Sequence, residues 1–226
     1  MLVQFAIACG NLVSVLGAYL RRGMLAEMKV RELKLHILAF SSENHLLSVI
    51  HPFTNRDSSI SNFEMTAARA ILQPSHSSIL FGAQNVGVEE AETDKFLVVS
   101  PYTSPPHLLD LARYSRASQL FANALTLFQP VREDYATAGY TKSFNFAQVM
   151  ETLKFLSREE GYTWKKTEFY VVSFRSKLSP DADPEKLFQL DAYSHQEAMA
   201  SGGLLKYWYG VKDQDRRNLA TCMRRL

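Results

Sequence analysis

The sequence has few of the residues that build disulfide frameworks or metal centres. Its 226 residues include only two cysteines, Cys9 and Cys222, which lie far apart and outside any C-x-x-C pair. Its six histidines show neither H-x-H nor H-E-x-x-H spacing. We therefore expect no disulfide framework and no metal site, and we interpret the cysteines as reduced thiols of a cytoplasmic protein.

The sequence also lacks the features that bind nucleotides and nucleic acids. It contains no glycine-rich phosphate loop, because Gly202-Gly203 ends an expected helix instead of opening one. The formal net charge is only +2, and the basic residues form no long stripe. We expect no cofactor and no nucleic-acid partner, and we interpret the locally basic C-terminal end as a solvated hairpin and tail.

One long apolar run, residues 2–20, precedes Arg21-Arg22 and leaves three interpretations open. The run approaches the roughly 20 residues that a membrane span needs, but polar residues interrupt it. Neither a basic leader nor a clean cleavage site marks a signal peptide. We favour a packed or interfacial helix over a membrane anchor or an imperfect signal. The sequence has no Asn-x-Ser/Thr glycosylation site, which also disfavours secretion.

The hydrophobic content of 46% is enough to bury a core. We expect residues 1–40 to form an N-terminal arm of apolar helix and strand, and residues 41–226 to form a single α+β domain. Turn signals and apolar periodicity then place further elements along the chain. These are strands at 30–40, 78–81 and 96–100, helices at 66–72, 118–129 and from 145 onward, and a proline-rich connector at 101–106.

The stretch 168–178 predicts a strand, because it is rich in β-branched and aromatic residues and ends at a turn signal. Alternate residues of a strand point to opposite faces. We expect the face with Tyr170, Val172 and Phe174 to be buried and the sheet to have one dry side. The other face carries Phe169, Val171, Ser173 and Arg175.

The next helix has clear signals at both ends. Asp183 can cap its N-terminus with Pro184 at the first helical position, and Gly202-Gly203 can end it. A second strand follows at 204–211, with Leu205, Tyr207 and Tyr209 expected on one face and Leu204 and Trp208 on the other. A polar hairpin and a third strand at 218–223 complete a β-α-β-β succession. This is the first two-thirds of a ferredoxin-like unit, incomplete at the C-terminus and preceded by an N-terminal α/β extension.

Several separated motifs follow one another over about residues 96–222, including Phe96-Leu-Val-Val-Ser-Pro-Tyr102, Phe169-Tyr-Val-Val-Ser-Phe-Arg175, Ser201-Gly-Gly-Leu-Leu-Lys-Tyr-Trp-Tyr-Gly210 and Asn218-Leu-Ala-Thr-Cys222. Their order resembles that of an uncharacterised fungal protein family. The family has no established activity, so the resemblance implies no site residues. Its pattern continues through a further helix and strand, so this copy looks C-terminally shortened. We expect N-terminal segments or a second chain, as in a homodimer, to cover the sheet edge left by the missing strand.

Asp191 and His195 form the candidate catalytic pair. Their i,i+4 spacing places both on one side of the expected helix. A carboxylate beside an imidazole can orient one ring nitrogen and raise its basicity, which prepares a general base. The plainer interpretation, which we favour, is a surface pair that contributes about 0.5 kcal/mol.

The aromatic residues of the two strands form a candidate substrate pocket. Tyr170, Phe174, Tyr207 and Trp208 could line it, with Arg175 available for a ligand carboxylate. Aromatic residues on strands are more often part of a core, so we favour core packing for them and keep the pocket as the alternative. The absence of a strong catalytic motif favours a small-molecule-binding or accessory protein of fungal metabolism with an apolar or aromatic ligand. One alternative is a cofactor-free enzyme that acts on an aromatic or polyketide-like metabolite with His195 as base, and the other is a protein-interaction module.

Overall fold

The structure, a computed structural model, describes residues 24–37, 48–52, 58–59 and 95–225. The apolar run 2–20, the expected helix at 66–72 and the expected strand at 78–81 lie outside the described residues. The described chain mixes helices with antiparallel sheets, so the α+β class is confirmed.

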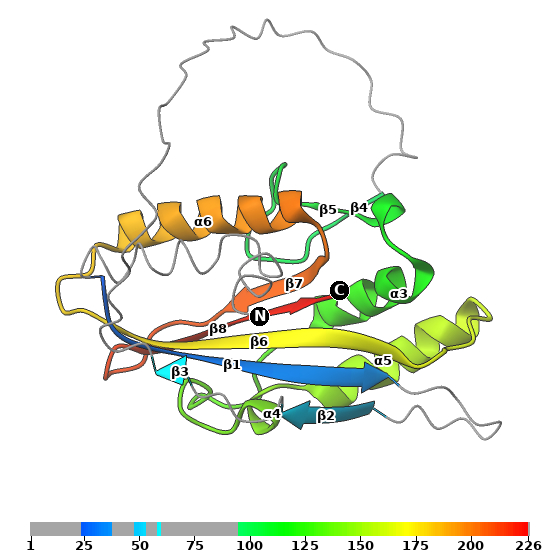
Figure 1. Ribbon diagram of the computed structural model, residues 1–226, viewed down its shortest axis with the longest axis horizontal. Helices are drawn as coiled ribbons and strands as arrows, with labels where there is room; N and C mark the ends of the chain where they lie inside the picture. The colour runs from blue at the N-terminus through cyan, green and yellow to red at the C-terminus, as the bar shows by residue number, and fades with distance from the viewer. Residues whose placement is uncertain (1–23, 38–47, 53–57, 60–94, 226) are drawn as a thin grey trace, which may run out of the picture.

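A six-stranded antiparallel sheet forms the centre of the described structure (Figure 1). Its strands run in the order β2-β1-β6-β8-β7, and β3 also pairs with β1. A separate two-stranded sheet joins β4 and β5. The strands are β1 Leu25–Ile37, β2 Ser48–Pro52, β3 Ser58–Ser59, β4 Phe96–Leu97, β5 Leu109–Asp110, β6 Thr167–Leu178, β7 Leu204–Tyr209 and β8 Arg217–Arg224.

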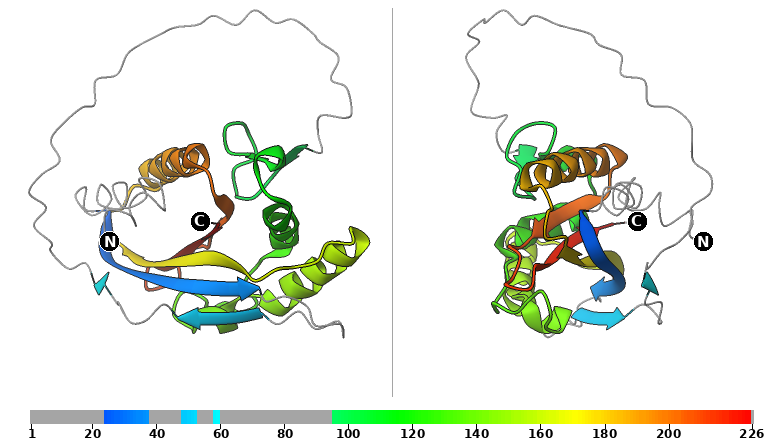
Figure 2. Two further views of the ribbon diagram at one scale, coloured as in Figure 1. Left: turned by 45° about the vertical axis from the view of Figure 1, so that its right-hand side comes forward. Right: turned by 90° about the vertical axis from the view of Figure 1, so that its left-hand side faces the viewer.

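Helices cover both faces of the large sheet (Figure 2). The long helix α6 lies over one face, and α3 and α5 pack against the other. Each face therefore has its own apolar cluster. The helices are α3 Arg116–Ala124, α4 Tyr140–Ser143, α5 Phe146–Glu159 and α6 Pro184–Ser201, with 3-10 turns η2 Leu111–Arg113 and η3 Leu125–Leu127.

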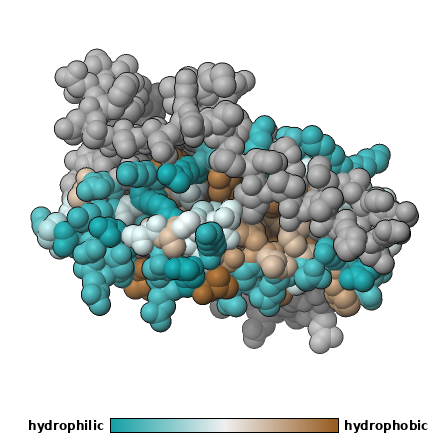
Figure 3. Space-filling view, turned by 90° about the horizontal axis from the view of Figure 1, so that it is seen from below, coloured by the Kyte–Doolittle hydropathy of each residue, from teal (hydrophilic) through white to brown (hydrophobic). Residues whose placement is uncertain are grey.

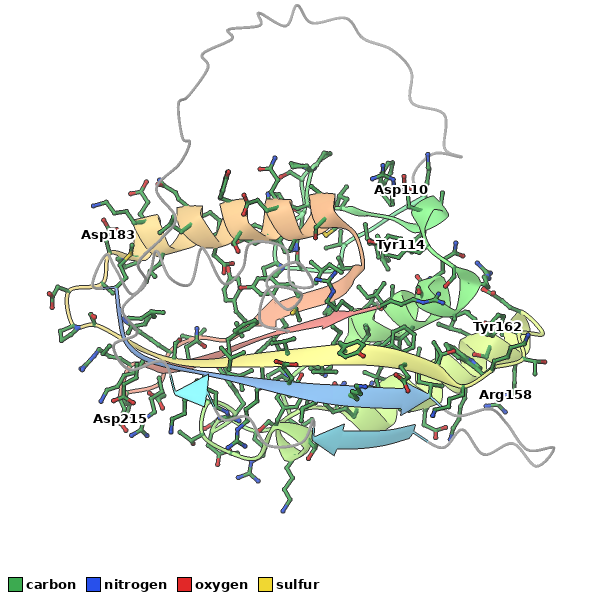
Figure 4. All side chains as sticks on the ribbon, viewed as in Figure 1. Asp110, Tyr114, Arg158, Tyr162, Asp183 and Asp215 are labelled. Carbon is green, nitrogen blue, oxygen red and sulfur yellow. The ribbon has the colours of Figure 1, made fainter. Side chains whose placement is uncertain are left out.

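Helix α6 begins and ends where its sequence signals predict. The Asp183 carboxylate accepts hydrogen bonds from the backbone N–H groups of Glu185 and Lys186 at 3.0 and 3.2 Å. Figure 4 labels Asp183 at this end of the helix. At the other end Gly202 has φ +78°, a conformation that costs glycine little because it has no Cβ. The predicted cap and stop are both confirmed.

Helix α6 connects two parallel strands of the sheet. Strand β8 lies between β6 and β7 and is antiparallel to both, so β6 and β7 run in the same direction. The predicted succession β6-α6-β7-β8 within one sheet is confirmed. The other edge of β6 pairs with β1 along almost its whole length, from Leu25 opposite Leu178 to Ile37 opposite Thr167. An N-terminal segment therefore covers that edge.

The prediction of a single dry face of the sheet was wrong. Phe169 and Val171 are fully buried on the side of α3 and α5, and Phe174 is only 6% exposed on the side of α6. The sequence pattern of β6 does not show the second layer, because the helices that cover it come from residues 116–159.

The predicted alternation of β7 was also wrong at its start. The pairing of β7 with β8 shifts register between Leu204 and Lys206. An extra residue at such a bulge reverses which face the later side chains occupy. Leu204 consequently packs with Tyr207 on the α6 side, whereas Leu205 joins the cluster beneath α3 and α5.

Two further boundaries differ from the sequence prediction. The expected helix at 118–129 ends at Ala124 and continues only as the turn η3, and the expected strand at 96–100 is limited to Phe96–Leu97. Asn145 precedes α5 as predicted, but its side chain makes no cap hydrogen bond to that helix. Its amide nitrogen donates to the side chain of Gln148 in α5 and to the carbonyl of Leu127, and its amide oxygen accepts from the N–H of Gln129. These bonds tie α5 to the end of η3.

The surface seen from below, on the side of α4 and β2, is mostly hydrophilic where residues are described, with smaller hydrophobic areas between (Figure 3). In the described part of the chain, none of the helices combines the length and apolar character that a membrane crossing requires.

Candidate functional site

A groove of about 350 Å³ lies between α6 and the sheet face that it covers. Polar groups meet the groove at Asp191, Ser194 and Asn218, and Lys212 contributes a charged side chain. The groove is thus an apolar space with a few convergent polar groups, the usual composition of a small-molecule site. Its apolar walls include Leu25, Phe174, Leu178, Leu187, Phe188, Tyr207 and Tyr209.

Two tyrosines hold the Asp191 carboxylate at one side of this groove. The hydroxyl of Tyr102 donates to Oδ2 at 2.6 Å, and the hydroxyl of Tyr207 donates to Oδ1 at 2.5 Å. Burial raises the pKa of Asp191, and the two hydrogen bonds partly oppose that rise because they stabilise the ionised form. The cluster therefore joins the 101–106 connector, α6 and β7 through one carboxylate.

A pair of histidines packs against the same tyrosines. Nδ1 of His195 lies 2.9 Å from Nδ1 of His107, and the two ring centroids are 5.1 Å apart. The Tyr102 ring stacks on His107 with centroids 4.7 Å apart. Desolvation, together with a smaller effect of the neighbouring His107, lowers the pKa of His195 to about 4. Both imidazoles are consequently neutral near pH 7, because desolvation lowers the pKa of His107 as well.

The structure changes the interpretation of the predicted pair. His195 is only 2% exposed, so the expected surface pair was wrong. Asp191 and His195 do share the side of α6 that faces the sheet, as their spacing predicts. However, the carboxylate accepts its hydrogen bonds from Tyr102 and Tyr207, and the imidazole orients against His107. Asp191 is therefore anchored to the sheet, and His107 sets the position of the His195 ring.

The predicted pocket residues divide between the two faces of the sheet. Phe174 and Tyr207 line the groove as expected. Trp208 lies on the opposite face, where its ring meets the rings of Tyr135 and Phe144 edge-on at 5.2 and 5.1 Å. Its assignment to the same pocket was wrong, because adjacent residues of a strand cannot share a face.

Arg175 likewise points away from the groove. Its guanidinium donates to the carbonyls of Tyr135, Ala136 and Ala138 and so holds the segment before α4. It is not placed to bind a ligand carboxylate beside Phe174. Tyr170 also lies outside the groove lining, and the ammonium of Lys34 sits 5.5 Å from the centre of its ring.

Sequence reasoning did not identify Tyr102 and His107 as site residues. Both lie in or just after the proline-rich connector, and no local spacing relates them to α6. The only sequence signal for Tyr102 was its place in one of the motifs that supported the family resemblance. Within the described ranges, no group of three histidine, cysteine, aspartate or glutamate side chains is arranged to hold a metal ion.

Residues 98–225 match the protein family described as PB2B2.08-like. The chain belongs to this family. It is 38% identical over 144 residues to the UPF0643 protein PB2B2.08 of Schizosaccharomyces pombe. That match covers 60% of this chain and 64% of the relative, so the chain spans less than two-thirds of the relative's length. No solved structure matches the chain.

The matched range 98–225 contains every residue of the cluster around the Asp191 carboxylate. These residues are Tyr102, His107, Asp191, His195 and Tyr207. The family match and the fission yeast relative support the prediction of an uncharacterised fungal family.

Proposed function

We propose that the protein binds a small, mainly apolar or aromatic molecule in the groove between α6 and the sheet. The observation that carries this proposal is the groove itself, whose volume of about 350 Å³ falls within the usual range of ligand pockets. Its aromatic walls suit a flat or apolar ligand. We further propose that this ligand comes from fungal metabolism, including secondary metabolism, and that the protein has a cytoplasmic accessory role.

The polar side of the groove defines the ligand's chemistry further. Each Asp191 oxygen already accepts one tyrosine hydroxyl but retains a second acceptor position. A ligand hydroxyl or amine can donate there, whereas a ligand carboxylate would meet a like charge. The favoured ligand is therefore an apolar molecule with a hydrogen-bond donor at one end.

The alternative of a cofactor-free enzyme with His195 as base has less support. With a pKa of about 4, His195 is a weak base near neutral pH. Its unpartnered Nε2 is buried, and His195 lines a cavity of only about 20 Å³, which does not admit a metabolite. The binding proposal requires no such chemistry.

We also infer a ferredoxin-like arrangement in which β1 occupies the position that the final strand takes in that unit. The order β1-β6-β8-β7 and the α6 crossover support this, since β1 flanks β6 in the way that the last strand of that unit flanks the first. In this arrangement β1 pairs with the outer edge of β6, and the groove lies beneath the crossover helix.

Incubation of the full chain with a fungal metabolite extract, followed by native mass spectrometry, tests the proposed function. Phe188 lines the groove and is 54% exposed, so Phe188→Ala removes apolar wall at little cost to the core. We expect it to weaken retention by about tenfold. Phe155 on α5 is 56% exposed and lies outside the groove lining, so Phe155→Ala is the matched control and should retain ligand normally. Retention of nothing by the full chain, or equal losses in both variants, would overturn the proposal.

A further inference from the structure

A second, much smaller cavity lies beside the groove, between α6 and strands β7 and β8. Its volume is about 20 Å³. The residues that line it come from the inner side of α6 and from the strand face beneath. They are Asp191, Ser194, His195, Leu204, Cys222 and Arg224, together with Ala198 and Tyr207.

Three of these residues carry buried polar atoms that have no hydrogen-bond partner within the described structure. They are Oγ of Ser194, Nε2 of His195 and Nε of Arg224. The three residues are 4%, 2% and 8% exposed, so water at the protein surface does not satisfy them. A buried polar atom without a partner is costly, and natural proteins rarely leave one. Three such residues around one cavity indicate that something occupies it.

We propose that this cavity binds one small hydrogen-bond acceptor, the size of a water molecule or a chloride ion. The volume exceeds the 10–15 Å³ or so that a single water needs, and three polar partners match the two to four that a buried water makes. The space is too small for a polyatomic ligand such as phosphate. The cavity shares Asp191, Ser194 and Tyr207 with the groove lining. Its test detects what occupies the cavity and not what the groove retains, so the two proposals can fail independently.

Arg224 determines that the ligand must be an acceptor, because a guanidinium N–H can only donate. One terminal nitrogen of this side chain already donates to the carbonyl of Gly202 at 3.2 Å, which fixes the guanidinium. Among the described residues no carboxylate lies within ion-pair distance of Arg224, which favours a chloride ion. Asp191 lines the same cavity and is a potential negative charge, which favours a neutral water.

The two occupants differ in what they require of the histidine pair. Chloride only accepts hydrogen bonds, so it requires the proton on Nε2 of His195. Nδ1 of His195 must then accept from Nδ1–H of His107, which lies 2.9 Å away. A water can also donate to an unprotonated Nε2, and so it is compatible with either tautomer. A chloride in the cavity therefore fixes the tautomers of both histidines, whereas a water does not.

Crystals of the full chain, grown in sodium bromide and in halide-free sodium acetate, test the proposal. A bromide anomalous peak in the cavity identifies a halide site. A density peak that appears in both salts without anomalous signal identifies water. Nitrogen-15 NMR measures the tautomer of His195 independently of the crystals. A bound halide requires the proton on Nε2. An empty cavity in both crystals would overturn the proposal.

Ser194→Ala gives a second test, because an occupied and an empty cavity predict opposite changes in the urea midpoint of unfolding. If a ligand occupies the cavity, the variant loses a hydrogen bond and its urea midpoint falls. In an empty cavity the variant removes an unsatisfied hydroxyl, so the midpoint stays the same or rises. Ser201→Ala on the same helix is the control, since its hydroxyl is bonded to the carbonyl of Ala198 and lies outside the cavity lining. An unchanged or raised midpoint for Ser194→Ala would contradict the bound ligand.

Discussion

Nδ1 of His107 and Nδ1 of His195 lie 2.9 Å apart, although 88 positions separate these residues in the sequence. Two neutral imidazoles can make this contact, because one ring donates its N–H and the other accepts. Two protonated rings cannot, since each would then present an N–H to the other. The contact therefore couples the stability of the fold to the combined charge of the two histidines.

The first prediction concerns pH. The pKa of His195 is about 4 in the folded protein and 6.5 for an ordinary histidine. Between these values the unfolded chain binds a proton that the folded chain excludes, so stability rises with pH. Acidification from about pH 7 to about pH 4 should remove up to about 3 kcal/mol through this group, with little further loss from it below pH 4.

Urea unfolding of the wild type and of His195→Gln across this range measures that contribution. The difference in unfolding free energy between the two proteins should change steadily from about pH 6.5 to about pH 4. Parallel pH curves would show that His195 does not exclude a proton. Other titratable groups near His195 are unchanged in both proteins, namely His107, Tyr102, Tyr207, Asp191 and Arg224.

The second prediction concerns the hydrogen bond from Tyr207 to Asp191. Tyr207→Phe removes one of the two donors to a desolvated carboxylate, so it should cost about 1.5–3 kcal/mol of unfolding free energy near neutral pH. It should also raise the pKa of Asp191 further, because that hydrogen bond lowers it. Tyr193→Phe on the exposed side of α6 is the matched control and should change stability by less than about 0.5 kcal/mol. Equal effects of the two variants would contradict the proposed anchor.

The third prediction concerns the turn after α6. Gly203 has φ +82°, and a Cβ there would lie 2.8 Å from the backbone oxygen of Arg225. Gly203→Ala should therefore cost at least about 1 kcal/mol in chemical denaturation. Gly139 has φ −58° and space for a Cβ, so Gly139→Ala should be neutral or stabilise by up to about 1 kcal/mol. A neutral Gly203→Ala would show that the turn relaxes freely.

The fourth prediction concerns Arg175, which lies on the sheet face opposite the groove. Arg175→Met leaves the carbonyls of Tyr135, Ala136 and Ala138 without their donor, so amide hydrogen exchange around residues 135–140 should become faster. Stability should fall by about 1–3 kcal/mol. Lys177→Met on the same strand is the control and should leave this exchange unchanged. Ligand retention should also stay normal, because Arg175 lies outside the groove lining, and a selective loss of retention would contradict this placement.

The sequence by itself determined the features that depend on neighbours within a few residues. Asp183 and Pro184 begin α6 and Gly202 ends it, because capping and positive φ are local properties of the backbone. The β-branched and aromatic run of β6 and the spacing that places Asp191 beside His195 on one side of α6 are local as well. Motif order also indicated the fungal family.

The tertiary structure decided which residues meet across long separations. The bulge in β7 reversed the expected alternation after Leu204, and α3 and α5 covered a face that the sequence of β6 left undecided. Strand β1 paired with β6 from more than a hundred residues away. Above all, the contact of His107 with His195 depends on how the connector folds against α6, and no periodicity within either segment encodes that packing.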